Sequence, residues 1–528
     1  MQVTDCTVKN TSSGVSDPEA LFRTLQAAKT EIDTLKQQLC QARQQLDWFK
    51  RQLFGRKSEK RIIDNPHQLD LGELLGDTPV PAEPEPEEIT YRRRKRTKQR
   101  SEDDVTDSGL RFGPEVPVEV IELSAPQLEG PAAEQYEVID YKISHRLAQL
   151  PGSYVVMEYR RPILKHKPSA RLMEVPAPSA VFEGSLADVS LLAGLLVDKF
   201  CYHLPLYRQH QRLKDAGITL SRSTLTNYVQ RSIELLQPIY DAQWQHILQS
   251  RVLAMDETPI KAGRKKKGQM KASWYWPIYG ENDEICFTWS DSRGSAHIEQ
   301  QLEGFSGVLL SDGYAAYDRY ARNKPGITQA QCWAHTRRYF ERASKSDPAA
   351  EEALTLIGGL YRVEQQIREK ELAGEEKLAY RSHHALPIVD AFFAWCHNQC
   401  QRMDLVNSDP LAKALVYAEN HRGQLKAYLS DPAVPIDTNH LGRALRVIPM
   451  GRKNWLFCWS EVGAKQVGII QSLLTTCRLH QVDPYTYLVD VLQRVALHPA
   501  RDVEELTPRG WKERFAANPL HSDLDHAH

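Results

Sequence analysis

A seven-residue repeat of apolar residues runs through the first part of the chain. Residues 17–60 are rich in Gln, Lys, Arg, Ala and Leu, a composition that favours helix. The repeat consists of Leu25, Ile32, Leu39, Leu46 and Leu53, with Ala28, Leu35, Ala42 and Phe49 at the intermediate positions. Because such a repeat keeps one apolar stripe facing a partner helix, it predicts a leucine-zipper-like coiled coil that joins two or more copies of the chain. The alternative is one long amphipathic helix packed on its own protein.

The next segment, residues 61–109, is predicted to be a linker. It alternates Pro with Glu in PVPAEPEPEE and then carries the basic block RRRKRTKQR. Proline and like-charge repulsion both oppose a packed core, so we expect a disordered acidic and basic linker. Its basic block either neutralises phosphates as a flexible arm or serves as a solvated tether.

Alternating apolar and polar positions return in residues 110–185. The runs VPVEVIEL, YEVIDYKISHRLAQL and SYVVMEYRRPILKHK are rich in β-branched residues, and they predict a small segment of short strands. Residues 186–248 change to helical patterns.

Within that helical region, residues 202–236 fit a helix-turn-helix. Ala216-Gly217-Ile218 suits the turn, and Ser221 or Ser223 can cap a second helix that buries Leu225, Tyr228, Val229 and Ile233. Arg222, Thr224 and Asn227 are then expected to face outward, where such side chains reach phosphates or base edges. A plain helical hairpin fits the same residues.

From residue 249 the pattern predicts a mixed sheet. The runs VLAMDETPI, KASWYWPIYG and EICFTWSDS read as three antiparallel strands, followed by the helix SAHIEQQLEGF and the strand GVLLSDGYAAY. This is the element order of a ribonuclease-H-like core, in which the fourth strand lies beside the first. Asp256 ends the first strand and Asp312 ends the fourth, so we expect the two carboxylates to converge.

Converging carboxylates point to metal-dependent phosphate chemistry. Two divalent cations held by acidic oxygens can activate an attacking oxygen and stabilise the leaving one, and Mg²⁺ prefers a few carboxylates together with phosphate oxygens. Taken alone, an Asp after an apolar run is more typical of a turn or a helix cap. The two aspartates together, in this strand order, favour the metal site.

Five phrases of the sequence carry a family resemblance. In chain order they are VLAMDETPIK, GVLLSDGYAAYDRY, QCWAHTRRYF, IDTNHLGRALRVIPMGRKNWLF and DPYTYLVDVLQRV. Together they resemble the transposases of insertion sequence 66, of the TnpC type, and the likeness runs from about Asp17 to Leu524. It implies a DDE-type DNA transposase, in which three acids with Mg²⁺ cut DNA at the element ends and join the freed 3′-hydroxyl to a target. It also implies a leucine zipper, a small zinc-binding segment and a ribonuclease-H-like catalytic domain with a helical insertion.

One acid of this family pattern is missing. Asp256 matches the first catalytic acid and Asp312 the second, so both are expected to be catalytic and to hold metal. The third is a Glu immediately before Arg-Ala-Leu-Arg, where this chain has Gly442. On a helix, Asp437 would point away from that position, and Glu461 belongs to a later element. We therefore expect an incomplete two-ion Mg²⁺ site and severely impaired strand transfer.

Three functions remain open at this stage. The first is an impaired DNA transposase whose partners are element ends, target DNA and accessory proteins of the element. The second is a dimeric DNA-binding remnant that occupies element ends without cutting them. The third is a ribonuclease-H-like nuclease that uses the two acids and a recruited ligand. Gly442 is the residue that separates the first two.

The cysteines depart from the family pattern as well. Residues 110–185 contain none, so no zinc is expected in this segment, which would be a degenerate zinc-binding segment. Cys332 and His335 have ligand-like spacing, and Cys396 and Cys400 lie one helical turn apart, but each pair supplies too few ligands. Buried structural cysteines are the preferred interpretation.

Two basic segments near the acids are candidate DNA contacts. The loop KAGRKKKGQMK carries Lys261, Arg264, Lys265, Lys266, Lys267 and Lys271, which can grip a phosphate backbone or form a solvated hairpin tip. Near Gly442, a second backbone contact with one stacking surface is expected from Arg443, Arg446, Arg452, Lys453 and Trp455.

The expected architecture is a multidomain α/β protein. Its parts are the coiled coil 17–60, the linker 61–109, the β-rich segment 110–185, the helix-turn-helix-like region 186–248, the catalytic domain 249–478 with a helical insertion 340–430, and a helical tail 479–524. In the insertion, the stripe of Ile388, Phe392, Phe393 and Trp395 is expected to be core.

Composition narrows the class of protein. The 528 residues are 41% hydrophobic and 26% charged with a net charge of -1, which excludes a wholly disordered chain and a uniformly basic nucleic-acid coat. The chain has no apolar run near the ~20 residues of a bilayer span, and its start lacks a signal-peptide pattern. Nine scattered cysteines fit free thiols in a reducing compartment, so we expect a cytoplasmic protein.

Overall fold

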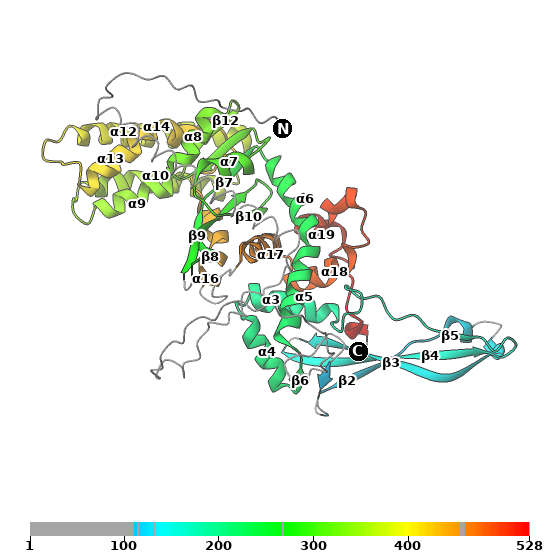
Figure 1. The fold of residues 1–528 in the computed structure, drawn as a ribbon. Coiled ribbons are helices and arrows are strands. Elements are labelled where there is room, and N and C mark those ends of the chain that lie inside the picture. The colour runs from blue at the N-terminus through cyan, green and yellow to red at the C-terminus, as the bar shows by residue number, and fades with distance from the viewer. Residues whose placement is uncertain are drawn as a thin grey trace, which may run out of the picture. The chain divides into compact units, whose positions relative to one another are not determined.

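The computed structural model describes residues 110–526, apart from 113, 115, 130–132, 151, 267–268 and 453–459. The predicted coiled coil and linker lie outside these residues. The described part is a mixed α/β fold with three sheets and many helices (Figure 1). In this part of the chain, no helix is both long and apolar enough to cross a membrane.

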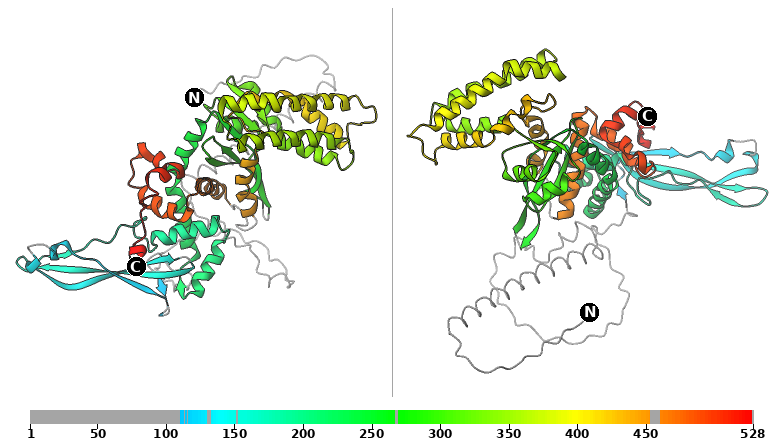
Figure 2. Two further views of the ribbon diagram at one scale, coloured as in Figure 1. Left: turned by 180° about the vertical axis from the view of Figure 1, so that it is seen from behind. Right: turned by 90° about the horizontal axis from the view of Figure 1, so that it is seen from above.

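The sheet that comes first in chain order is small. Its strands are β2 (Val118–Glu122), β3 (Tyr136–Leu150), β4 (Ser153–His166) and β5 (Leu172–Glu174), in the order β2-β4-β3 with β5 also on β4. The expectation of short strands was wrong for β3 and β4, which have 15 and 14 residues and pair as one long antiparallel hairpin (Figure 2). Gly152, with a φ of +85°, takes the left-handed conformation at the turn that lets the chain reverse there.

Two helices joined by a turn occupy the region predicted as a helix-turn-helix or a plain helical hairpin, and the structure fits both. Helices α3 (Val189–Phe200), α4 (Leu206–Asp215), α5 (Arg222–Leu235) and α6 (Gln237–Leu248) follow the small sheet. Gly217 has a φ of +78° in the turn after α4, and the short strand β6 (Ile218–Thr219) pairs there with β1 (Arg111–Phe112). The Ser221 hydroxyl caps α5 by accepting from the Thr224 amide at 3.1 Å.

The central sheet has the order β10-β9-β7-β11-β12, with β8 also on β9. Strands β7 (Val252–Met255), β11 (Gly307–Ser311) and β12 (Ile327–Gln331) are parallel, whereas β9 (Gln269–Tyr279) is antiparallel to β7 and to β10 (Ile285–Ser290). The prediction that the fourth strand lies beside the first is therefore confirmed. The first run is split, because the chain leaves β7 at Asp256 and re-enters the sheet as β8 (Thr258–Lys266).

Helix α17 (Glu461–Leu479) covers the outer side of β10. Ser472 and Thr476 accept hydrogen bonds from the amides of Phe287 (2.8 Å) and Ile285 (3.3 Å), so their hydroxyls take the place of a neighbouring strand. One turn earlier on the same helix face stands Gly468, where an added Cβ would lie 2.5 Å from the Phe287 carbonyl oxygen. The four-residue spacing of these small residues is what allows so close an approach.

Most of the chain that follows β10 is helical. In chain order, helix α7 (Ser295–Gln301) precedes β11 and α8 (Ala315–Asn323) follows it, and the two helices contact each other. A helical insertion follows β12 (Figure 1). It comprises α9 (Trp333–Ala343), α10 (Ala350–Glu369), α11 (Gly374–His384), α12 (Leu386–Cys400), α13 (Pro410–Asn420) and α14 (Arg422–Lys426). Phe392, Phe393 and Trp395 are buried there and Ile388 packs against them, which confirms this stripe as core.

The insertion also buries a charged pair. Arg381 is fully buried and donates to both carboxylate oxygens of Glu364, at 2.8 and 2.9 Å, and to the backbone carbonyl of Tyr428. This guanidinium therefore ties α10 and α11 to the chain that leads back to the sheet.

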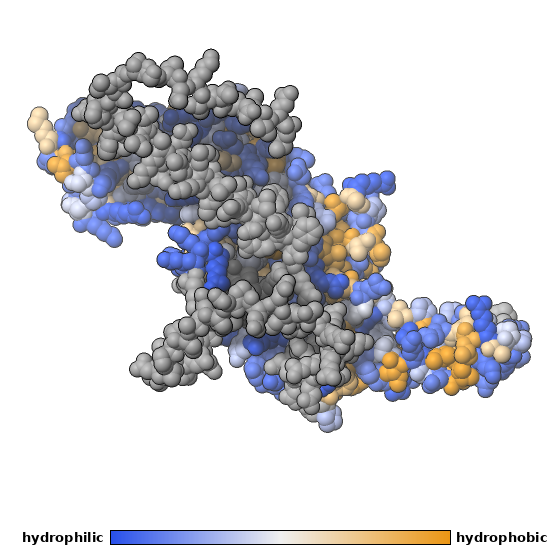
Figure 3. Space-filling view, in the orientation of Figure 1, coloured by the Kyte–Doolittle hydropathy of each residue, from blue (hydrophilic) through white to orange (hydrophobic). Residues whose placement is uncertain are grey.

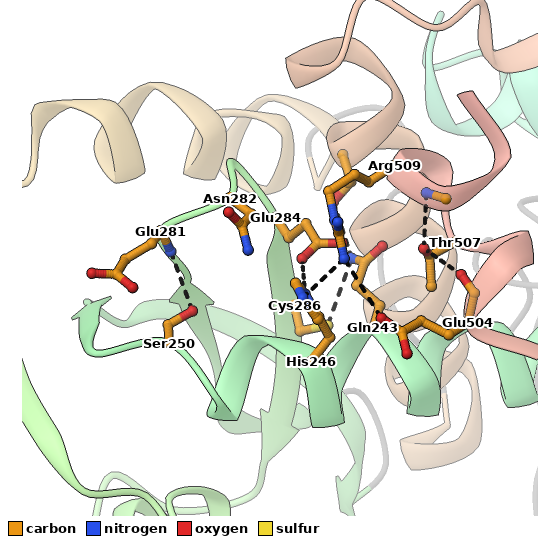
Figure 4. Close-up of polar contacts among 12 residues, drawn as sticks. Gln243, His246, Ser250, Glu281, Asn282, Glu284, Cys286, Glu504, Thr507 and Arg509 are labelled. Atoms are coloured by element: carbon orange, nitrogen blue, oxygen red, sulfur yellow. Dashed lines mark hydrogen bonds and ion pairs between the residues drawn. The ribbon is translucent and has the colours of Figure 1, made fainter. Parts of the chain in front are cut away.

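The helices of the last part of the chain contact earlier elements through polar side chains. They are α15 (Asn439–Leu445), α16 (Val447–Gly451), α18 (Pro484–Arg494) and α19 (Pro508–Arg514). Figure 4 shows Arg509 of α19 beside His246 of α6 and the buried Glu284, with 2.9 Å from Arg509 Nη2 to His246 Nε2. Because a guanidinium only donates, His246 Nε2 accepts, and its Nδ1–H donates to Glu284.

Candidate active site

The two predicted acids meet at one edge of the central sheet. Leu310 of β11 pairs with Ala254 of β7, and two residues further along each strand are Asp312 and Asp256. Because neighbouring strands lie about 4.8 Å apart, this shared register sets the two aspartates side by side just beyond the strand ends. Strand β10 runs in the same direction as β7, so its end also reaches this edge.

Each carboxylate is oriented by the backbone that follows it. Asp256 Oδ1 accepts from the amide of Glu257 at 2.8 Å, and Asp312 Oδ1 accepts from the amide of Tyr314 at 3.0 Å. The chain turns sharply after each strand, and this turn is why a short acidic side chain can bond the amides just ahead of it.

Burial and mutual repulsion disfavour the charged forms of these acids. Burial, with a contribution from the Asp312 charge, raises the pKa of Asp256 to about 7, although the Glu257 amide and the Arg338 charge oppose the shift. Burial also raises the pKa of Asp312, while its hydrogen bond from Tyr314 and the charge of Arg293 lower it. Like-charged groups taken from water favour a proton or a cation.

A third acid, Glu257, lies beside the pair but is fully engaged. Arg293 donates through Nε to Glu257 Oε1 at 2.9 Å and also through Nη2, and the Tyr317 hydroxyl donates to Oε2 at 3.0 Å. Its side chain is 4% exposed. Within the described residues, no group of three or more His, Cys, Asp or Glu side chains is arranged to hold a metal ion.

Helix α15, which carries Gly442, begins at the same edge. The Cys332 amide donates to the carbonyl of Ser311, next to Asp312, and Cys332 Sγ in turn accepts from the Thr438 amide at 3.3 Å. A Cβ added at Gly442 would meet no described atom within 4 Å. Asp437 precedes the helix, and its oxygens accept from the backbone and side-chain nitrogens of Asn439 at 3.0 and 2.5 Å.

Several residues of this edge escaped the sequence reasoning. Glu257 directly follows Asp256, and Arg338 stands in the phrase QCWAHTRRYF, so both had a local signal. Arg293 and Tyr417 had none, because long stretches of chain separate them from the acids. Tyr417 of α13 accepts from the amide of Gly313, next to Asp312, at 3.1 Å.

The basic segment between the first two predicted strands lies on the β8–β9 hairpin. Lys265 and Lys266 are exposed at the end of β8, where Figure 3 shows a strongly hydrophilic surface. Lys267 lies outside the described residues. The ammonium of Lys271 pairs with Glu461 at 3.0 Å, and its DNA contact stays a prediction. Residues 261–266 belong to strand β8 and pair with β9, so the segment expected to be a loop is largely strand.

The second basic segment is placed in part. Arg443 and Arg446 are exposed on and just after α15. Arg452 is half-buried and donates to the carbonyl of Pro259 at 2.5 Å, so part of its guanidinium bonds the protein itself. Lys453 and Trp455 lie outside the described residues.

Two of the three residues on α5 that were expected to face outward do so. Arg222 and Asn227 are exposed on α5, as the sequence predicted. The outward position expected for Thr224 was wrong: it is buried, because its hydroxyl lies 2.9 Å from the capping Ser221 hydroxyl and so turns inward.

The cysteine interpretation also holds only in part. Cys332 and Cys396 are buried, whereas Cys400 is exposed because it lies on the solvent side at the end of α12. Burial lowers the pKa of His335 to about 4.

The sequence is similar to known proteins over most of its length. The family model described as Transposase IS66 family matches residues 184–466, IS66 C-terminal element matches residues 472–509, and Transposase C of IS166 homeodomain matches residues 41–106. Among curated relatives from Sinorhizobium fredii (strain NBRC 101917 / NGR234), the uncharacterized protein y4hP is 31% identical over 72% of this chain and 72% of its own. The uncharacterized protein y4jD is 31% identical over 65% of this chain and 69% of its own.

A solved structure also matches in part. The Mos1 transposase paired-end complex with left transposon end has 13% identity and a TM-score of 0.14, over 43% of this chain and 82% of that chain. So low a score supports no argument about this chain.

Proposed function

Because the chain belongs to the IS66 transposase family, we propose that it binds DNA at the ends of its element through a ribonuclease-H-like core whose Asp256 and Asp312 are ligands for Mg²⁺. The observation that supports this proposal most directly is the shared register of the two aspartates at the ends of β7 and β11. The strand order of the central sheet, with β11 beside β7, is the one that such a core requires.

The residues at this edge fit a divalent cation. Burial disfavours the charged forms of both half-buried carboxylates. A cation bound between the two groups would make these charged forms favourable. The hydrogen bonds from the following amides use Oδ1 of each residue, so Oδ2 is the atom proposed to bind metal. When bound, Mg²⁺ activates an attacking oxygen and stabilises a leaving one in phosphodiester transfer.

The DNA is proposed to contact several basic surfaces. Arg222 and Asn227 on α5 are candidates for groove contacts, and Lys265 and Lys266, at the far end of β8, for phosphate contacts. Arg443 and Arg446 extend the phosphate surface along α15. These residues bind and orient DNA, and they leave the chemistry to the acid pair.

The proposed enzyme is severely impaired because of Gly442. Two other acids near this edge already have partners: Glu257 bonds Arg293 and Tyr317, and Asp437 bonds Asn439. This engagement favours the second candidate function, a DNA-binding remnant that occupies element ends without cutting them. The dimer through residues 17–60, accessory proteins of the element and a cytoplasmic location remain predictions.

Restoring the acid tests the proposal. The Gly442→Glu variant should cleave a labelled DNA fragment that carries the element end in the presence of Mg²⁺, whereas wild type and the uncharged Gly442→Gln variant should cleave it far more slowly. The open space around Gly442 allows both side chains. Adding Asp256→Asn to Gly442→Glu should abolish cleavage. If wild type cleaves as fast as Gly442→Glu, the claim of impairment is wrong; if cleavage survives Asp256→Asn, the assignment of the acid pair is wrong.

A further inference from the structure

Arg293 presents a positive charge at the acid edge. It lies in the loop between β10 and α7, and its guanidinium is stacked over the Tyr314 ring, 4.1 Å from the centroid. The Tyr314 hydroxyl donates to the Arg293 carbonyl at 2.8 Å, and the Tyr314 amide is the group that orients Asp312. The same tyrosine therefore fixes both the cation and one of the two acids.

Glu257 is the buried partner that pairs with the Arg293 guanidinium. Its side chain is 4% exposed, whereas that of Arg293 is 46% exposed. Arg293 uses Nε and Nη2 on Oε1 of Glu257, and Oε2 is occupied by Tyr317. The ion pair is thus buried on the carboxylate side and open on the guanidinium side, which is the arrangement of a cation held in place for something in solvent.

The charge of Arg293 also reaches the proposed metal ligands. It lowers the pKa of Asp312, against the larger effect of burial. A guanidinium offers five N–H donors in a rigid plane, and two oxygens of a phosphate can accept a pair of them. With Nε and Nη2 turned to Glu257, the other edge of the plane faces outward.

We propose that Arg293 binds a non-bridging oxygen of the DNA phosphate that enters the Asp256–Asp312 edge, and that Glu257 and Tyr314 are positioning residues for it. This inference rests on the proposed function, because it takes DNA as the ligand of this edge. No bond is made or broken in the step. Arg293 holds the phosphate against the two acids, where preorganised positive charge is most effective.

A salt titration without metal tests this contact apart from catalysis. The probe is a labelled 30-base-pair duplex that carries the element end, in EDTA, over a series of NaCl concentrations. Each phosphate contact contributes about 0.9 to the slope of log K against log salt. Replacing Arg293 alone would leave the buried Glu257 without its counter-charge, so the informative comparison is Glu257→Gln with Glu257→Gln/Arg293→Gln.

The double variant should show a slope smaller in magnitude by about 0.9 than Glu257→Gln alone, and Glu257→Gln/Arg293→Lys should keep the larger slope. Arg501→Ala is the matched control, because this arginine is 86% exposed in the C-terminal segment and should leave the slope unchanged. Equal slopes for Glu257→Gln and Glu257→Gln/Arg293→Gln, with equal thermal stability, would reduce Arg293 to a structural partner of Glu257.

The two proposals fail in different ways. Cleavage by Gly442→Glu together with equal salt slopes would support the proposed function and overturn the role of Arg293. A slope difference without any cleavage by Gly442→Glu would support the phosphate contact and count against the transposase chemistry. If Glu257→Gln/Arg293→Lys in the Gly442→Glu background cleaves far better than Glu257→Gln/Arg293→Gln, the charge is what matters, as proposed.

Discussion

Asp256→Asn should make the metal-free protein more stable at neutral and alkaline pH. The pKa of Asp256 is about 7 in the folded chain against an ordinary 3.8, chiefly because of burial. A shift of about three units corresponds to about 4 kcal/mol, at 1.36 kcal/mol per unit. Since the side chain is only half-buried and retains some water, we expect a gain of about 1–3 kcal/mol.

The sign of the pH dependence follows from the raised pKa. Below about pH 4 the carboxyl is protonated in both the folded and the unfolded chain, and it costs nothing. Between about pH 4 and pH 7 the unfolded chain loses this proton while the folded chain keeps it, so wild type loses stability progressively over this window and loses no more above it. Asparagine carries no charge and can still accept from the Glu257 amide, so the variant does not suffer this loss.

Thermal unfolding in EDTA measures this difference. The Tm of Asp256→Asn minus that of wild type should be small at pH 4, should rise between pH 4 and pH 7, and should level off above pH 7. Asp241→Asn, on the exposed face of α6, is the control and should track wild type at every pH. Adding Mg²⁺ at pH 8 should raise the Tm of wild type and not that of Asp256→Asn. A Tm difference that does not change with pH would refute the reasoning.

Three further substitutions test the packing. Gly468→Ala should destabilise the fold by about 1–3 kcal/mol, because its Cβ would lie 2.5 Å from a β10 carbonyl oxygen. The control Gly423→Ala should not, because a Cβ there would meet no described atom within 4 Å. Equal melting temperatures for the two variants would contradict the close approach. Arg381→Met should cost about 3–5 kcal/mol by leaving buried Glu364 unpaired, and denaturant unfolding should show most of this recovered when Glu364→Gln is added. Tyr417→Phe should cost about 1 kcal/mol and, in Gly442→Glu, should lower cleavage by weakening the loop after β11; unchanged cleavage would separate the insertion from the site.

The acid pair was predictable because it depends on strand order. Once the runs ending in Asp256 and Asp312 are taken as first and fourth strands, adjacency follows from chain topology, and β7 and β11 pair in this way. The cap at Ser221 and the buried face of α5 were equally local, since they depend on spacing within a few residues.

The surroundings of the acids were not predictable in the same way. Arg293 and Tyr417 reach the edge from separate loops and helices, and no periodicity in their own segments indicates this. Thr224 shows a different limit. It lies four residues before Tyr228 on the buried face of α5, and its hydroxyl also meets the capping Ser221, which the polar character of its side chain does not reveal. The long β3–β4 hairpin was underestimated because continuous alternation does not reveal where a strand stops.

The small residues on α17 have a consequence for handling this protein. An uncovered edge strand offers its amides to any extended chain that meets it. In this fold the hydroxyls of Ser472 and Thr476 accept hydrogen bonds from two amides of the edge strand β10. Partial melting of the helix would uncover it again while the rest of the sheet stays intact. Preparations that are warmed or mutated near residue 468 should therefore precipitate before they unfold, and light scattering would rise ahead of the loss of ellipticity.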